Sequence, residues 1–252
     1  VLPNSLKSAI VPWLARIPHR TGYVGEARGL LLTDTRRLDR KAYPRLVDRF
    51  VALAAKPGEL LPTRSAPVLV PNAGNAAEAF RALGLATRRP VAIFCPGAEY
   101  GPAKRWPTDH FATLGRRLID SGYAVWIIGS PNDQLAADPL AAMVPEIRNA
   151  CGRTDLGTAI DLLAGASVVV SNDSGLMHAA AAVGVPLVGL FGSSSPEYTP
   201  PLSPLARVAR IDIVCSPCFQ RVCPLGHFKC MRELSPNVVY DLARLGAKRE
   251  LR

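Results

Sequence analysis

Between residues 88 and 200, short apolar runs alternate with amphipathic segments. The apolar runs predict buried strands at residues 91–95, 124–128, 167–171 and 185–191, with a shorter strand near residue 147. Apolar residues at helical spacing predict helices that begin at 108 or 109 and at 132 or 133, and further helices at 155–166 and 176–183. Continuous apolar strands that alternate with helices are typical of an α/β fold with a parallel sheet.

The predicted strands end in loops of small and polar residues. In a parallel sheet, ligands bind in the crevice beyond the carboxyl ends of the strands. Four predicted strand ends should face that one crevice, namely residues 96–99, 129–130, 172–175 and 192–194.

The first part of the chain has a less regular pattern. It predicts a short helix at 6–14, a clearer one at 43–55 and a short strand at 68–70, the last within a proline-rich connector. We expect a domain boundary close to Thr87. Residues 1–87 would then form a first domain with its connector, and residues 88–252 a second domain.

Composition and charge restrict the classes of partner. The chain has 252 residues, 48% of them hydrophobic and 20% charged, which is typical of a globular protein. Its formal net charge is +10, which favours phosphorylated small molecules, an anionic membrane surface or nucleic acid. The longest uncharged apolar run, 179–192, is too short to span a bilayer. Dinucleotide, P-loop, hydrolase and zinc-protease motifs are absent, and the scattered basic residues argue against nucleic acid.

The segment 171–178 joins a predicted strand to a predicted helix. The backbone N–H groups of Ser174 and Gly175 would be first-turn donors, which suit a diphosphate. Asp173 can accept hydrogen bonds from sugar hydroxyls, and His178 lies one turn further along. The alternative is that Asp173 or Ser174 only caps the helix and His178 is a packed core histidine.

The segment 96–107 is rich in glycine and proline and carries two adjacent cations. Lys104 can neutralise a pyrophosphate leaving group, whereas Arg105 is better explained as part of a solvated basic loop. Gly97 is a candidate for contact with the same ligand. Glu99 and Asp133 follow strand ends, where each can bond a sugar hydroxyl or cap a helix.

Four cysteines cluster near the carboxyl end, and their spacing would let four thiolates converge on zinc or an iron–sulfur cluster. These candidate metal ligands are Cys215, Cys218, Cys223 and Cys230. His227 can substitute for a thiolate. The alternatives are one or two disulfides, or free thiols packed in a loop. Cys95 and Cys151 are expected to be small core residues.

Several motifs together resemble those of the ADP-heptose:lipopolysaccharide heptosyltransferases of glycosyltransferase family 9, and among these the type II enzymes. They occupy residues 2–9, 17–22, 96–107 and 172–178, and the cysteine segment resembles a feature of part of that family. The resemblance implies the GT-B fold, with two Rossmann-like domains whose parallel sheets face a cleft. The first of these domains would be incomplete in this chain.

The resemblance also implies an activity. Family members transfer L-glycero-D-manno-heptose from ADP-heptose to the first heptose of the lipopolysaccharide inner core, with inversion and without metal in the chemistry. By motif position, Lys104 would hold the diphosphate, Asp173 the heptose hydroxyls, and the amides of 174–175 the phosphates. His178 would lie beside that site, and Asp133 near the adenosine ribose.

The general base of the family would precede Val1 in a strand and a glycine-rich loop. Asp34 and Asp39 are acids in the first domain, but nothing in the sequence supports either as the base. The function expected is therefore inverting heptose transfer. The alternatives are a non-catalytic nucleotide-sugar binding fragment, a metal-stabilised interaction domain and, more remotely, a sugar-nucleotide epimerase.

The partners that the resemblance implies are the ADP-heptose donor and a lipopolysaccharide core acceptor at the membrane surface. No nucleic acid is expected. The implied location is cytoplasmic, with peripheral attachment to the inner face of the inner membrane.

Overall fold

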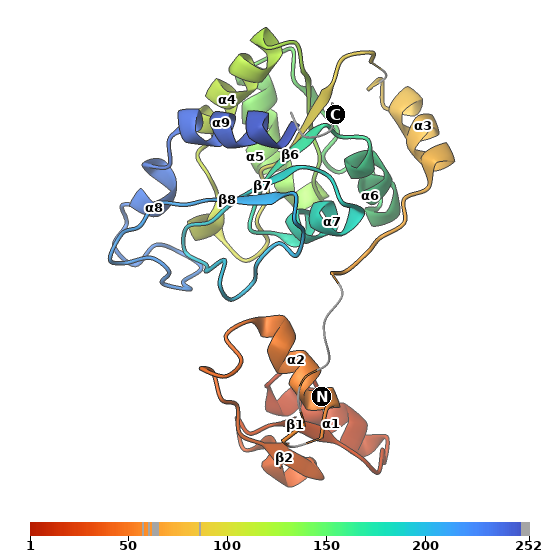
Figure 1. The fold of residues 1–252 in the computed structure, drawn as a ribbon, viewed down its shortest axis with the longest axis vertical. Coiled ribbons are helices and arrows are strands. Elements are labelled where there is room, and N and C mark those ends of the chain that lie inside the picture. The colour runs from red at the N-terminus through yellow and green to blue at the C-terminus, as the bar shows by residue number, and fades with distance from the viewer. Residues whose placement is uncertain (57, 60, 62–65, 86, 248–252) are drawn as a thin grey trace. The chain divides into compact units, whose positions relative to one another are not determined.

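The computed structural model of the chain describes residues 1–56, 58–59, 61, 66–85 and 87–247, and it contains two compact units (Figure 1). Unit 1 comprises Val1–Ser65 and Glu197–Pro200, and unit 2 comprises Ala66–Pro196 and Pro201–Arg252. The division falls earlier in the chain than the boundary expected close to Thr87.

Unit 2 is built on a six-stranded sheet in the order β5-β4-β3-β6-β7-β8, and every neighbouring pair is parallel. The strands are β3 (Val91–Cys95), β4 (Ala124–Ile127), β5 (Arg148–Asn149), β6 (Val168–Asn172), β7 (Leu187–Leu190) and β8 (Ala206–Ala209). Every residue of β3 and β6 is buried, which explains the apolar runs at 91–95 and 168–170. The strands predicted in this region are all present within one or two residues, and β8 was not predicted.

Helices cover both faces of this sheet. They are α3 (Ala73–Ala82), α4 (Thr108–Asp120), α5 (Gln134–Met143), α6 (Leu156–Ala164), α7 (Gly175–Val183), α8 (Lys229–Arg232) and α9 (Pro236–Ala247). Helices α4, α5 and α9 pack on one face, and α3, α6 and α7 on the other (Figure 1). Alternate strand residues serve the two cores, with Phe94 in the first and Ile93 in the second. Each such fully buried side chain contributes about 2 kcal/mol.

Residues 66–85 belong to unit 2 because they are fastened to its second face. Asn72 caps α3, and its own N–H donates to the buried carboxylate of Asp161 in α6 at 2.7 Å. Asn75 donates to the same carboxylate. The strand expected at 68–70 is wrong: this stretch is irregular, with the Leu69 N–H bonded to the Ala182 carbonyl at 2.9 Å.

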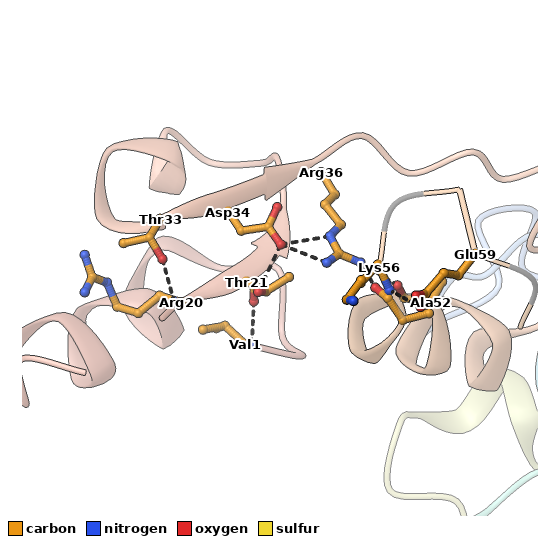
Figure 2. A network of polar contacts seen from close by, with 10 residues as sticks. Val1, Arg20, Thr21, Thr33, Asp34, Arg36, Ala52, Lys56 and Glu59 are labelled. Atoms are coloured by element: carbon orange, nitrogen blue, oxygen red, sulfur yellow. Dashed lines mark hydrogen bonds and ion pairs between the residues drawn. The ribbon is translucent and has the colours of Figure 1, made fainter. Parts of the chain in front are cut away.

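Unit 1 contains α1 (Leu6–Leu14), β1 (Thr21–Tyr23), the 3-10 helix η1 (Arg28–Leu31), β2 (Asp34–Arg36) and α2 (Leu46–Ala54). Both predicted helices are present, and β1 and β2 form a parallel pair. Figure 2 shows Asp34 accepting hydrogen bonds from Thr21 at 3.1 Å and Arg36 at 2.8 Å. Arg36 also donates to the Ala52 carbonyl at 2.7 Å, which ties β2 to α2.

Within the described ranges, no helix has the length and apolar character needed to cross a membrane.

Candidate functional site

The candidate site lies in unit 2, at the edge of the sheet where the parallel strands end. Because all strand pairs are parallel, the loops after β3, β4, β6 and β7 share this edge, as expected. Buried Asn172, the last residue of β6, fastens two of them together. Its Nδ2 donates to the Pro96 carbonyl at 2.7 Å, and its Oδ1 accepts from the Trp106 N–H at 3.1 Å. The loop after β3 is therefore held against the end of β6.

A close ion pair bridges these two loops. Lys104 ends the 3-10 helix η2 (Pro102–Lys104), and its Nζ lies 2.6 Å from Oδ2 of Asp173. The Asp173 side chain is 4% exposed and that of Lys104 is 17% exposed. Removing one partner of a buried ion pair costs about 3 kcal/mol or more, because the other charge is left unpaired. The structure thus brings together Lys104, which the sequence analysis placed at the diphosphate, and Asp173, which it placed at the sugar hydroxyls.

The amino end of α7 borders the ion pair. Ser174 is the N-cap residue, but its side chain makes no capping hydrogen bond, so the alternative that it only caps the helix is wrong. First-turn N–H groups have no partner within a helix, and the helix dipole adds positive potential there. A Cβ built on Gly175 meets no atom within 4 Å. The space beside this helix end is therefore open to a ligand.

His178 lies one turn into α7 and faces the ion pair. Its Nε2 is 4.0 Å from Oδ1 of Asp173, and its side chain is 45% exposed, so it is not a packed core histidine. Burial of its inner side lowers the pKa of His178, the Lys104 ammonium lowers it further, and the Asp173 carboxylate opposes this change. The lowered pKa therefore favours the neutral form of His178 at pH 7.

Gly97 and Asp133 come together at the ends of β3 and β4. A Cβ on Gly97 would lie 2.0 Å from Oδ1 of Asp133, so this approach requires glycine. Oδ2 of Asp133 accepts from the N–H and the hydroxyl of Ser130, each at 2.8 Å, in a capping box for η3 (Pro131–Asp133). The Asp133 side chain thus has a capping role at η3 but makes no capping bond to α5, and its contact with a ribose stays a prediction.

Glu99 and Arg105, two further residues of the loop after β3, differ in their exposure to solvent. Glu99 is exposed on the loop, and its contact with a sugar stays a prediction. Arg105 is only partly exposed, and its Nε is buried without a hydrogen-bond partner. The interpretation of Arg105 as part of a solvated basic loop is therefore wrong.

All six cysteines are free thiols in the structure, so the disulfide alternative is wrong. Cys95 and Cys151 are buried as expected, and burial raises the pKa of Cys151 to about 12. Across the described ranges, no three histidine, cysteine or acidic side chains form a group that can hold a metal ion. His227 Nδ1 instead accepts from the Lys229 N–H at 3.0 Å. A metal at Cys215, Cys218, Cys223 and Cys230 stays a prediction.

The acids of unit 1 serve its own structure. Hydrogen bonding from Arg36 holds the pKa of Asp34 below its usual range, which makes this carboxylate a weak proton acceptor. Asp39 accepts from the N–H groups of Lys41 and Ala42 at 2.8 and 3.0 Å and so stabilises a turn. Neither residue is placed as a general base.

Three residues at this edge of the sheet were not predicted individually as site residues from the sequence. Asn172 and Tyr100 entered only as members of motifs, although a polar residue that ends a buried strand is itself a signal. Arg221 was not considered. Its Nε donates to the Tyr100 carbonyl at 2.7 Å across 121 residues of sequence, and no local pattern indicates such a contact.

Comparison with known proteins gives a consistent result. The model of "Glycosyltransferase family 9 (heptosyltransferase)" matches residues 1–229. Lipopolysaccharide heptosyltransferase 2 of Escherichia coli (strain K12) is 48% identical over 222 residues, covering 84% of this chain and 64% of that protein. Lipooligosaccharide heptosyltransferase 2 of Haemophilus influenzae is 46% identical over 224 residues, with the same two shares. The chain thus spans 64% of the length of these curated relatives.

The solved structure of Escherichia coli ADP-heptose lps heptosyltransferase II superimposes with a TM-score of 0.87 at 40% identity. The superposition covers 99% of this chain and 76% of the Escherichia coli chain. Escherichia coli heptosyltransferase WaaC with ADP shares the fold, with a TM-score of 0.64 at 20% identity, over 97% of this chain and 73% of that chain. These likenesses confirm the α/β class with parallel sheets and the GT-B assignment.

Proposed function

Because this chain belongs to glycosyltransferase family 9, the heptosyltransferases, we propose that it binds ADP-heptose and takes part in inverting heptose transfer. The acceptor proposed is the first heptose of the lipopolysaccharide inner core. The observation that carries the proposal is the Lys104–Asp173 pair beside the uncapped, open amino end of α7.

The amino end of α7 supplies the diphosphate site. The N–H groups at 174–175 point out of the first turn, and the helix dipole favours an anion there. Gly175 leaves room for a phosphate to reach these donors. The site thus offers neutral donors and a partial positive charge on one side of the diphosphate.

Lys104 supplies the full positive charge. When the bond between the heptose anomeric carbon and the diphosphate oxygen breaks, negative charge grows on the departing ADP. An ammonium that is already ordered by Asp173 stabilises this charge without rearrangement, and we propose that it does so in place of a metal ion. Asp173 is proposed to accept hydrogen bonds from the heptose hydroxyls as well.

Inversion needs a direct attack on the anomeric carbon. The acceptor hydroxyl forms the new bond on the face opposite the departing ADP, and its proton passes to a general base. We assign that base to none of the described residues. The net charge of +10 suits an acceptor that carries phosphates at an anionic membrane surface.

Calorimetric titration with ADP tests the donor site. We expect wild-type protein to bind ADP and Lys104→Met to weaken binding by about ten- to a hundredfold, since a charge-assisted hydrogen bond is lost. Lys41→Met, an exposed lysine of unit 1, is the control and should bind as wild type does. Equal affinity in wild type and Lys104→Met would overturn the proposal.

A transfer assay with ADP-heptose and a heptose acceptor tests the reaction itself. We expect Asp173→Ala and Lys104→Met to lose transfer. Tight ADP binding without any transfer would instead identify a nucleotide-sugar binding fragment.

A further inference from the structure

A stretch of the cysteine segment, residues 216–221, reaches from the end of β7 to the loop that carries Lys104. We name these residues the clamp. Its first part is anchored beyond β7, where the Ser216 hydroxyl donates to the Gly192 carbonyl at 2.7 Å and the Phe219 N–H donates to the Ser193 carbonyl at 2.6 Å. Its position is thus fixed by the sheet edge that also bears the candidate site.

The clamp then forms hydrogen bonds with both the side-chain hydroxyl and the backbone carbonyl of Tyr100. The Tyr100 hydroxyl donates to the Phe219 carbonyl at 2.7 Å, and the Arg221 Nε donates to the Tyr100 carbonyl at 2.7 Å. Tyr100 and Arg221 are both exposed. These bonds therefore join two surface segments, and removing them leaves the apolar core intact.

The clamp also bonds directly to the turn that holds Lys104. The Ala103 N–H donates to the Arg221 carbonyl at 3.0 Å. Gly101 has a φ of +154°, and a Cβ there would lie 2.4 Å from the same carbonyl oxygen. The close approach of the clamp to η2 therefore requires glycine at 101.

The Tyr100 ring lies close to two cations. The Lys104 Nζ is 5.0 Å from the ring centroid and the Arg221 guanidinium carbon is 5.5 Å from it. An ammonium at this distance is attracted to the ring face. The ring therefore restrains the same ammonium that pairs with Asp173.

We propose that Tyr100 and Arg221 are positioning residues that hold Lys104 in place for the donor diphosphate. The proposal rests on the function proposed above. A 3-10 helix of three residues is not stable by itself, and a lysine side chain loses much rotamer entropy when it is fixed. The clamp orders η2 and the Lys104 side chain before the ligand binds, and this reduces the entropic cost of ligand binding.

Calorimetry with ADP on single variants is the first test. We expect Arg221→Ala to weaken ADP binding by about tenfold and Tyr100→Phe, which keeps the ring, by about threefold. Arg221→Lys, which keeps a donor and a charge, should recover part of the affinity. Arg232→Ala is the matched control, because Arg232 is an exposed arginine at the end of α8, just after the cysteine segment, and its guanidinium lies 5.7 Å from the Phe228 ring centroid instead. Melting temperatures should stay within about 2 °C of wild type.

A double-mutant cycle separates positioning from any other role. If Arg221 acts through Lys104, Arg221→Ala should have no further effect on ADP affinity in a Lys104→Met background. An equal loss in both backgrounds would overturn the inference and leave the donor site standing. Failure of wild-type protein to bind ADP would overturn the proposed function and the inference together.

Discussion

Gly175 is the residue at which the open helix end can be tested most directly. An alanine there meets no atom within 4 Å, so Gly175→Ala should leave stability unchanged or slightly higher. Its methyl group occupies the space beside the first-turn donors, and we expect ADP affinity to fall by roughly tenfold. Calorimetry and thermal unfolding measure the two effects separately.

Gly157 provides a matched control for this change. It lies in the first turn of α6, in the same unit, and a Cβ there makes one ordinary contact at 3.6 Å. Gly157→Ala should therefore leave both stability and ADP affinity close to wild type. Unchanged ADP affinity in Gly175→Ala would show that no ligand approaches the amino end of α7.

The elements of unit 2 were predictable because burial imposes a clear pattern on them. Strands β3 and β6 are buried on both faces, so their positions are apolar or small except for Asn172 at the end of β6. Strands β1 and β2 have three residues each, too few for any period to show. Strand β8 lies at the sheet edge with only its last residue buried, and its pattern is correspondingly weak.

The site was predictable where it depends on strand ends and unpredictable where it depends on long-range contacts. Because parallel strands end at one edge of a sheet, the sequence pattern alone predicts that Lys104 and Asp173 lie close together. The contacts of Arg221 with Tyr100 join segments with no common period, and they depend on how an irregular segment folds back. Cysteine spacing predicted a metal for that segment, but it gave no indication of the hydrogen bonds that join the segment to the loop after β3.

Metal removal tests what holds the cysteine segment in place. The contacts that join it to the candidate site come from Ser216, Phe219 and Arg221, and none of them passes through a thiol. We therefore expect ADP affinity to be unchanged after treatment with a chelator, with metal content measured before and after. A loss of affinity that added zinc or iron restores would show that the thiols organise the site through a metal.

At the scale of the whole molecule, the two units carry different pH-sensitive groups. Because its pKa is lowered in the folded state, Asp34 in unit 1 stabilises the fold at pH values above its unfolded pKa of 3.8. This contribution to stability is lost as the pH falls through the folded pKa of Asp34. The lowered pKa of His178 in unit 2 affects stability at higher pH values than that of Asp34 does. Below its unfolded value of 6.5, the unfolded chain binds a proton that the folded chain resists.

Stability should therefore decline as the pH falls from 6.5 toward the folded pKa of His178 and level off below it. Chemical unfolding at a series of pH values measures this decline, and His178→Asn should reduce it because the proton is then bound in neither state. His19→Asn, an exposed histidine of unit 1, should keep the wild-type profile. A steeper decline in His178→Asn than in wild type would contradict the prediction, because it would mean that Asp173, 4.0 Å away, stabilises His178 as a cation more than burial and Lys104 disfavour its charge.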